Sequence, residues 1–346
     1  MKKIILILII FLLYGCYDYT EINDLVIISG MLIDYKDDNF IITSQIIENE
    51  KETNIKVYKT TGKTIDECIS KISELSNKDI FISHLKIIIL TEDLIKSKQD
   101  YYDYFLRNTK SKMNFDIYYI SNKYKDKIMN IYKDNNGSSL YLKDMIKFNN
   151  NIYSSSTKLS FLDLLYKEKE HITPIYPNIE IKDDELLYLK NLIIFDDKFN
   201  KIILDDKEGI YYNMLTNNLN KSTLTIPCNN NSFSIKINKS KTKFKWKNNT
   251  LYINIKLSSK MNNYDCKYDL NKSNTIKKLS SISDEQITKN INDLINKSKD
   301  NNVDFIGFNN YIYKHNNKKI SNYNIKVNVN TTITSIGELR KWNKIK

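Results

Sequence analysis

Apolar residues recur along this chain with two different periods, and each period predicts a different kind of element. Residues 25–34 and 40–48 are rich in β-branched side chains and flank a short polar stretch, which predicts a β-hairpin. Residues 80–90 and 113–120 have the composition of buried strands, and residues 101–107 between them have a helical pattern. A strand, a helix and a strand at this spacing predict a crossover between parallel strands.

Side chains that cap helices precede several of the apolar stretches. Thr64 and Glu67 have the spacing of a capping box, and Ser283 and Gln286 repeat it in the second half of the chain. Ser160 is expected to cap a third helix. The apolar faces expected for the two capping-box helices comprise Ile65, Cys68, Ile69, Ile72 and Leu75, and Ile287, Ile291, Leu294 and Ile295. Further helical patterns cover residues 123–133 and residues 140–148, and Asp205 or Asp206 is expected to cap a short helix.

Strand patterns dominate the second half of the chain. Residues 186–195 and 201–204 predict two strands around a turn, and residues 223–257 predict several successive strands. Two late strands are expected at residues 303–313 and 320–332. Together with the helices, these patterns predict an α+β fold with mixed sheets and packed helices.

Two of the three prolines lie in the stretch Thr173-Pro174-Ile175-Tyr176-Pro177. Proline ends helices and biases the preceding residue towards extended backbone, so a linker fits this stretch better than the interior of an element. We therefore expect an α/β-containing domain over residues 16–173 and an α+β domain over residues 178–346. The length leaves open a division of the second domain into two subdomains, which makes three domains in all.

The charge balance is basic but does not point to nucleic acid. The chain has 53 Lys and Arg against 41 Asp and Glu, a formal net charge of +12, and its hydrophobic content of 41% is that of a globular protein. Arg107 and Arg340 are its two arginines. Proteins that bind nucleic acid rely on the guanidinium group for phosphate and guanine contacts, so we predict no nucleic-acid partner.

The N-terminus has the pattern of a targeting segment. Residues 1–15 contain two lysines and then an unbroken apolar run that is too short to span a bilayer as a helix. Leu13-Tyr14-Gly15-Cys16 resembles a bacterial lipobox, which implies a cleaved signal peptide over residues 1–15, with diacylglycerol and a fatty acid on Cys16. An uncleaved anchor with an incidental cysteine is the alternative. Either arrangement tethers the chain to a membrane, and we expect the rest of it to fold on the extracytoplasmic face.

Residues that could carry catalysis are sparse. The three histidines are His84, His171 and His315, and none has a second ligand-type residue at metal spacing. His84 falls inside an apolar strand pattern, where a packing role is expected. No Gly-rich phosphate loop and no paired-carboxylate signature occurs. We therefore predict a protein that is not an enzyme, with no metal and no cofactor apart from the lipid on Cys16.

The remaining cysteines are three in number. Cys68 lies on an apolar helix stripe, so we expect a buried structural thiol. The spacings of Cys68, Cys228 and Cys266 match no zinc motif, and their redox state is left open.

One charge pattern is unusual. Lysines alternate with Ser, Thr, Phe and Trp along a predicted strand, so all of them share one face. A solvated face that also deters edge pairing is one interpretation. Contact with anionic lipid headgroups or an acidic partner is the other. The lysines are Lys239, Lys241, Lys243, Lys245 and Lys247.

Several short stretches along the chain occur together, in this order, in one known family. They are Gly15-Cys16-Tyr17-Asp18-Tyr19-Thr20-Glu21-Ile22-Asn23-Asp24-Leu25, Gly30-Met31-Leu32-Ile33-Asp34, Phe81-Ile82-Ser83-His84-Leu85-Lys86, Thr91-Glu92-Asp93-Leu94, Arg107, the surroundings of Pro177, Leu192-Ile193-Ile194-Phe195, Val303-Asp304-Phe305-Ile306-Gly307-Phe308 and Gly337. In these stretches the chain resembles the Ger(x)C lipoproteins, the C subunits of nutrient germinant receptors in spore-forming bacteria.

The resemblance implies a lipid-anchored protein on the outer face of the spore inner membrane. It implies two membrane-embedded partner subunits, of the A and B types, and a role in receptor assembly or in signalling during germination. We expect the surface near Cys16, including Asp18, Glu21 and Asp34, and a strand face of the second domain to contact these partners. A lipid-anchored solute-binding protein that holds the nutrient itself is the alternative.

Overall fold

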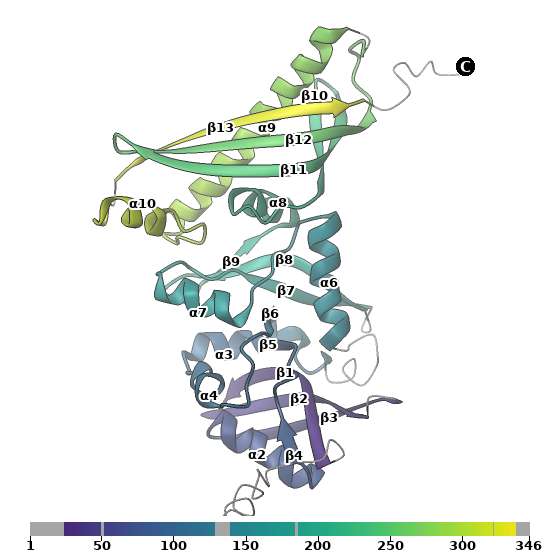
Figure 1. Cartoon of the computed structure of the whole chain (residues 1–346), viewed down its shortest axis with the longest axis vertical. Helices are drawn as coiled ribbons and strands as arrows, with labels where there is room; N and C mark the ends of the chain where they lie inside the picture. Colours follow the sequence, from purple (N-terminus) through teal and green to yellow (C-terminus); the bar gives the residue numbers. More distant parts are fainter. Residues whose placement is uncertain are drawn as a thin grey trace, which may run out of the picture.

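The computed structural model describes residues 24–49, 52–128, 139–183, 186–270, 272–320 and 322–336. They form an elongated molecule with two sheets, one after the other along its long axis (Figure 1). The α+β prediction is confirmed: mixed sheets and packed helices make up both halves.

The first sheet is nine-stranded and runs along the long axis. Its path is β3-β2-β1-β5-β6-β7-β8-β9, with the short strand β4 also paired with β1. The strands β1, β5, β6 and β7 are parallel, and antiparallel strands extend the sheet at both ends. Its strands are β1 (Leu25–Lys36), β2 (Asn39–Asn49), β3 (Glu52–Gly62), β4 (Asp79–Phe81), β5 (Ile87–Thr91), β6 (Asp116–Ile120), β7 (Tyr176–Lys182), β8 (Leu186–Phe195) and β9 (Lys201–Leu204).

Helices cover both faces of the first sheet. On one face lie α2 (Ile65–Ser76), α3 (Glu92–Ser97), α4 (Tyr102–Arg107) and α7 (Phe161–Lys169), which bury Cys68, Leu94, Phe105 and Phe161 in one apolar cluster. On the other face lies α6 (Ser139–Ile152), with Leu142 and Ile146 packed on Ile87 and Ile89 of β5. The predicted hairpin, and the crossover from β5 through α3 and α4 to the parallel β6, are confirmed.

The second sheet is four-stranded and has one helical layer. Its order is β10-β11-β12-β13, with the last pair parallel. Its elements are β10 (Ser222–Cys228), β11 (Asn231–Lys247), β12 (Thr250–Tyr264), α9 (Ser273–Asp300), α10 (Phe308–Asn316) and β13 (Asn324–Ser335). Leu251, Ile253 and Ile255 of β12 pack in one buried cluster with Ile287 and Ile291 of α9, so this face is the core of the second half.

Helix α8 (Asp206–Leu215) lies between the two sheets (Figure 1). Asp205 caps it, as predicted, and the side chains of Asp205 and Glu208 form a full capping box. Thr64 and Ser160 also accept hydrogen bonds from the backbone at the starts of α2 and α7, so these two helix starts are confirmed.

The strand expected at residues 80–90 and the helix start expected at Ser283 are wrong, and the helix expected at residues 123–133 is described only in part. The strand expected at residues 80–90 is interrupted by a turn at residues 82–86, where Leu85 N–H donates to the Ile82 carbonyl, so His84 lies in an exposed turn and not in a strand. Ser283 starts no helix: it lies inside α9, and its buried hydroxyl donates to the Leu279 carbonyl. Within residues 123–133, a short 3₁₀ helix (Asn122–Tyr124) is followed by a turn and by a helical Ile128, and residues 129–133 lie outside the described residues.

The first of the two late strands is also wrong. Asp304 accepts the backbone N–H groups of Gly307, Phe308 and Asn309, and this cap turns the chain into α10. Gly307 has φ +89°, a conformation that suits glycine. The apolar residues expected in a strand therefore lie on a loop and a helix, whereas the second late strand is confirmed as β13.

The expected domain boundary falls beside β7. Pro177 lies inside that strand, which pairs with β6 on one side and with β8 on the other. The first sheet thus continues past residues 173–178 as far as Leu204. A proline is tolerated at this position because Pro177 coincides with an irregularity in the β7–β8 register. The missing N–H therefore removes little of the hydrogen bonding between the two strands.

Candidate functional site

The carboxyl ends of three parallel strands meet at one edge of the first sheet. Asp34 lies near the end of β1, Thr91 ends β5, and Asn122 and Lys125 follow β6. This edge is where open sheets with parallel strands place their ligand sites. Here the four residues, with Asp93 from the start of α3, form a hydrogen-bonded group that we call the carboxyl-edge cluster.

Lys125 is the centre of the carboxyl-edge cluster. Its Nζ lies 2.9 Å from Asp34 Oδ2 and 3.0 Å from Asp93 Oδ2. Thr91 Oγ1 donates to Asp34 Oδ1 at 2.6 Å, and Asn122 Nδ2 donates to Asp93 Oδ1 at 2.6 Å. Burial works against the charge of Lys125, but the hydrogen bonds that its ammonium group donates to the two carboxylates outweigh it and raise the Lys125 pKa. The cluster is therefore satisfied internally and holds its charges as a fixed network.

Glu92 anchors a second group beside this cluster. Its carboxylate accepts hydrogen bonds from Lys96, from the Tyr119 hydroxyl at 2.6 Å and from Lys201 at 3.0 Å. Burial opposes ionisation of Glu92, yet these three donors outweigh it and lower its pKa to about 2. Lys201 begins β9, which lies four places from β5 in the strand order. The group therefore connects α3, the helix that follows β5, to the last strand of the sheet.

A shallow depression opens beside the carboxyl-edge cluster. It has a volume of about 610 Å³ and is lined by Tyr35, Asp37, Asp93, Lys96 and Lys125, among others. Charged side chains of both signs line it: Lys125 pairs with Asp93 across the lining, and Lys96 pairs with Glu92 beside it. Its lining offers no nucleophile with an adjacent base, so the arrangement provides a polar recognition surface and no sign of acid–base chemistry.

The joint between the two sheets is the other strongly organised region. Asn213 of α8 is fully buried, and its amide donates to the Ser154 and Ser156 carbonyls at 2.8 and 2.6 Å. On the other side of α8, Thr242 of β11 donates its hydroxyl to the Met214 carbonyl at 2.7 Å. The helix thereby connects the loop before α7 with the second sheet through buried, directional hydrogen bonds.

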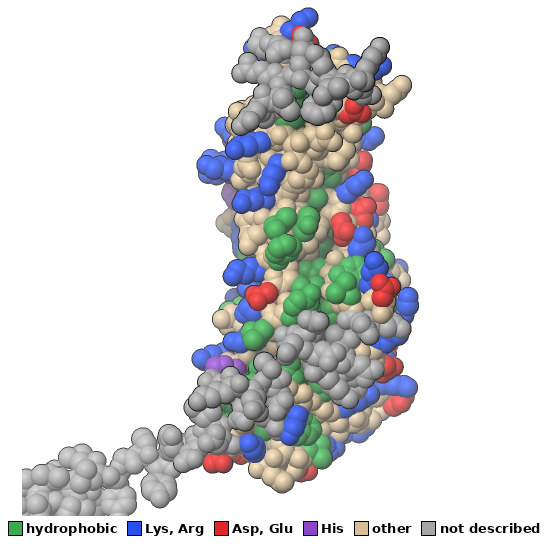
Figure 2. Space-filling model, turned by 90° about the vertical axis from the view of Figure 1, so that its right-hand side faces the viewer, with side chains coloured by type: hydrophobic (Ala, Val, Ile, Leu, Met, Phe, Trp, Pro, Cys, Tyr) green, Lys and Arg blue, Asp and Glu red, His purple; other side chains and the backbone are tan. Residues whose placement is uncertain are grey.

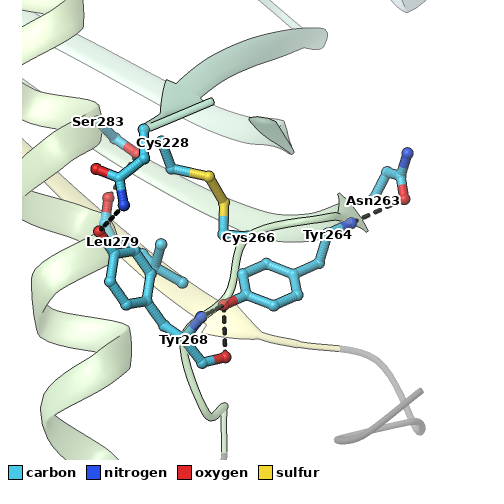
Figure 3. The surroundings of a disulfide bond; sticks show 8 residues. Cys228, Asn263, Tyr264, Cys266, Tyr268, Leu279 and Ser283 are labelled. Atoms are coloured by element: carbon cyan, nitrogen blue, oxygen red, sulfur yellow. Dashed lines mark hydrogen bonds between the residues drawn. A yellow bond between two sulfur atoms is a disulfide. The ribbon is translucent and has the colours of Figure 1, made fainter. Parts of the chain in front are cut away.

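A disulfide closes the far end of the second sheet. Cys228 ends β10 and bonds to Cys266 in the loop after β12, beside α9 (Figure 3). The hydroxyl of Tyr264, the last residue of β12, donates to the Tyr268 carbonyl in that loop and accepts from the Tyr268 N–H. Cys68 is a buried free thiol, as predicted, and burial raises its pKa to about 11. The spacing of cysteines in the sequence did not predict that Cys228 and Cys266 are bonded to each other.

The described residues that were expected to contact partners lie in different parts of the molecule, Asp34 in the first sheet and the β11 lysines in the second. Cys16, Asp18 and Glu21 lie outside the described residues. Asp34 is buried, and both of its carboxylate oxygens accept hydrogen bonds inside the chain. Its own charge is therefore not presented at the surface, where a partner contact was expected. The five alternating lysines from Lys239 to Lys247 are all exposed on one face of the second sheet, and the expectation that they share a face is confirmed.

Neither metal ligands nor a membrane span is found in the described part of the chain. Among these residues no group of three or more His, Cys, Asp or Glu side chains is placed to hold a metal ion. The helices described there are also too short or too polar to cross a bilayer.

The two sheets, joined by α8, define an α+β protein, and two family descriptions match consecutive segments of it that divide inside the first sheet. "Spore germination protein N-terminal domain" matches residues 18–181, and "Spore germination B3/GerAC like, C-terminal" matches residues 190–337. The chain therefore belongs to the Ger(x)C family of spore germination proteins, as the resemblance predicted. The two matches meet between β7 and β8.

Individual relatives agree with this assignment. Spore germination protein KC of Bacillus subtilis (strain 168) is 23% identical over 353 residues, which span 90% of this chain and 86% of the relative. Spore germination protein A3 of the same organism is 25% identical over 150 residues, 40% of either chain. The crystal structure of the GerBC protein matches 88% of this chain and 97% of its own with a TM-score of 0.57 at 14% identity, so the two share a fold.

Most of the carboxyl-edge cluster escaped sequence reasoning. Asp34 was singled out for a surface contact, and Thr91 and Asp93 lie in a stretch noted for its resemblance. Asn122 and Lys125 gave no signal, because lysine and asparagine are common throughout the chain. The signal that could have found them is position, since each polar residue follows the end of a predicted buried strand.

Proposed function

We propose that this chain is the lipid-anchored, non-catalytic subunit of a nutrient germinant receptor. It acts on the outer face of the spore inner membrane with membrane-embedded subunits of the A and B types, and it is needed for receptor assembly or signalling. The observation that carries the proposal is the ordered match of both family domains over residues 18–337, together with the fold shared with the GerBC protein.

A tether explains how such a subunit works without catalytic groups. Restriction to the membrane plane raises the effective concentration of the chain near membrane partners, so modest contacts suffice for assembly. Two acyl chains on Cys16 would supply the two hydrophobic signals that stable anchoring requires. The buried hydrogen bonds of α8 support a rigid connection between the two sheets, which suits a subunit that holds or transmits a fixed geometry.

Affinity purification from detergent-solubilised spore membranes tests the proposal. The tagged wild-type chain is expected to recover multi-span membrane subunits, whereas Cys16→Ala is expected to lose them and to slow germination. Recovery of the wild-type chain alone, under conditions that keep other membrane complexes intact, would contradict the receptor role.

A matched control separates tethering from the lipid itself. In this control an unrelated single-span anchor replaces residues 1–16, so the chain stays at the membrane without acyl groups. Restored partner recovery would assign the effect of Cys16→Ala to lost tethering. Normal germination by Cys16→Ala at normal protein levels would contradict the anchor.

A further inference from the structure

The second sheet has an extreme charge composition. Its four strands contain no aspartate and no glutamate, although the chain as a whole has 41 of them. They contain nine lysines, six in β11, two in β12 and one in β13. These are Lys236, Lys239, Lys241, Lys243, Lys245, Lys247, Lys256, Lys260 and Lys326, and every one of them is exposed.

These lysines lie on the face of the sheet that α9 leaves uncovered; we call it the lysine face. Cross-strand register places Lys241 opposite Lys256, and Lys245 in one row with Tyr252 and Lys326. Between these rows the register aligns Lys243 with two asparagines, Asn254 and Asn328. The intervening residues of β12 point to the opposite face and are buried against α9.

The lysine face is electrostatically uncompensated. None of the nine lysines forms an ion pair with a carboxylate in the described part of the chain. Lys241 lies directly opposite Lys256, and like charges in such a pair destabilise a sheet. A solvated face needs no such cost, since neutral polar side chains or mixed charges would serve equally well.

Protection of a sheet edge does not account for the pattern either. Lys256 and Lys260 lie on β12, which is a central strand. Along the free edge of β11, Asn217 already pairs with the Thr242 N–H and carbonyl, and the Tyr311 hydroxyl donates to the Phe244 carbonyl. On the other edge, Asp284 accepts the Thr331 N–H of β13. An added strand from an acidic partner would therefore find backbone groups of Thr242, Phe244 and Thr331 already occupied along the free part of β11 and along β13.

The lysine face lies along the flank of the molecule. The strands of the second sheet run across the long axis and follow one another along it (Figure 1). In Figure 2, turned by a quarter, Lys side chains gather along the upper left margin, which is the side that faces the viewer in Figure 1. A broad surface without carboxylates on the side of an elongated molecule fits an extended, negatively charged plane.

We propose that the lysine face docks on an anionic lipid surface, with the lysine ammonium groups and the asparagine amides binding lipid phosphate oxygens. Such contact lays the second half of the molecule along the bilayer. Lysines near an anionic membrane bind additively and lose this attraction as salt screens it. The inference is independent of the receptor role, because it requires only an anionic bilayer within reach of the chain.

Lysine footprinting of the full chain in vesicles tests the proposal. The chain is reconstituted into vesicles of phosphatidylcholine alone, or of phosphatidylcholine with phosphatidylglycerol, and exposed lysines are acetylated with a membrane-impermeant reagent. Mass spectrometry is expected to show labelling of Lys241, Lys243 and Lys245 slowed about fivefold or more by the anionic lipid. High salt is expected to abolish the difference. Lys277, Lys289 and Lys299 of α9 serve as internal references, with unchanged rates.

Two triple variants with the same change of charge sharpen the test. Lys241→Gln, Lys243→Gln and Lys245→Gln together are expected to remove the lipid-dependent protection of Lys256 and Lys326. Lys277→Gln, Lys289→Gln and Lys299→Gln together are expected to leave it intact. All six side chains are exposed, so the fold should be retained, and circular dichroism checks this.

Two results would overturn the proposal. One is equal labelling of the lysine face in both kinds of vesicle. The other is protection that appears with partner proteins but not with anionic lipid alone, which would assign the lysine face to an acidic protein surface.

Discussion

Thr91 donates its hydroxyl to the Asp34 carboxylate at 2.6 Å, although 57 residues separate the two in sequence. The same carboxylate pairs with Lys125, a further 34 residues along the chain. The bond exists because β1 and β5 are parallel neighbours whose carboxyl ends coincide. Asp34 and Thr91 lie in two of the stretches by which the chain resembles its family. The hydrogen bond joins these two stretches through a buried polar contact at the edge of the sheet.

Asp34→Ala is expected to destabilise the fold by about 2–4 kcal/mol, because it removes the acceptor of the buried Thr91 hydroxyl proton and leaves Lys125 with Asp93 as its remaining carboxylate. Urea unfolding measures the loss. Asp38→Asn, in the exposed turn after β1, is the matched control and should cost under about 0.5 kcal/mol. Equal stability of the two variants would mean that the carboxyl-edge cluster contributes nothing to folding.

Glu92→Gln is expected to change how stability depends on pH. The pKa of Glu92 is lowered in the folded chain to about 2, against 4.5 for an unperturbed glutamate. The ionised group therefore stabilises the fold above about pH 4.5, and this contribution disappears as the pH falls towards 2. The variant should lose about 1–3 kcal/mol at neutral pH and differ little from wild type in strong acid.

Thermal or urea unfolding across this pH range checks the expectation. Glu285→Gln on the exposed side of α9 removes the same charge without a buried environment and should leave the pH profile unchanged. A constant difference between Glu92→Gln and wild type at every pH would contradict a role for its ionisation.

Gly209→Ala is expected to destabilise the joint between the two sheets. Alanine normally stabilises a helix interior relative to glycine, by about 0.5–1 kcal/mol. Here a Cβ would lie 2.0 Å from the Ser155 carbonyl oxygen, so α8 or the loop before α7 must move. We expect a loss of about 2–4 kcal/mol by urea unfolding. Lys207→Ala, two residues earlier on the exposed side of α8, is the control.

A second readout makes the Gly209 variant informative about coupling. If α8 transmits force between the sheets, hydrogen exchange of the Asn213 neighbourhood should quicken in the variant before exchange in the strand centres does. Stabilisation by Gly209→Ala, as in an unconstrained helix, would contradict the tight contact.

Removal of the disulfide by Cys228→Ser and Cys266→Ser together is expected to cost about 4 kcal/mol, from the 38-residue separation that it closes. Urea unfolding in the presence and absence of a reductant measures this. The reductant should lower the midpoint for the wild type and leave the double variant unchanged. A wild-type midpoint that ignores the reductant would show that the bond does not form in solution.

Capping side chains predict helix starts in this chain more reliably than apolar runs predict strands. The capping side chains Thr64, Ser160 and Asp205 marked helix starts correctly, because a cap acts on the backbone within three residues of itself. Ser283 has the same spacing and misleads, since α9 already runs through it and its hydroxyl bonds to the preceding turn. A cap pattern is therefore informative only where the preceding residues are not themselves helical.

Longer apolar runs were less reliable than caps. The run at residues 80–90 contains a turn whose residues Ile82 and Leu85 are as buried as strand residues, so composition cannot reveal the break. Composition also misses the turn within residues 303–313. There Asp304 accepts backbone N–H groups and turns the chain into a helix, and the pattern of apolar residues does not reveal these hydrogen bonds.

The sequence by itself determined the class of the fold, most of the elements, the family and the shared face of the β11 lysines, because these follow from periods of two and 3.6 residues and from the order of short stretches. The tertiary structure alone decided which strands are neighbours. That choice extended the first sheet past Pro177, buried Asp34 beside Thr91 and Lys125, paired Cys228 with Cys266 and brought the lysines of β11, β12 and β13 together on one face. Each of these outcomes depends on contacts between residues far apart in the chain, which no local pattern encodes.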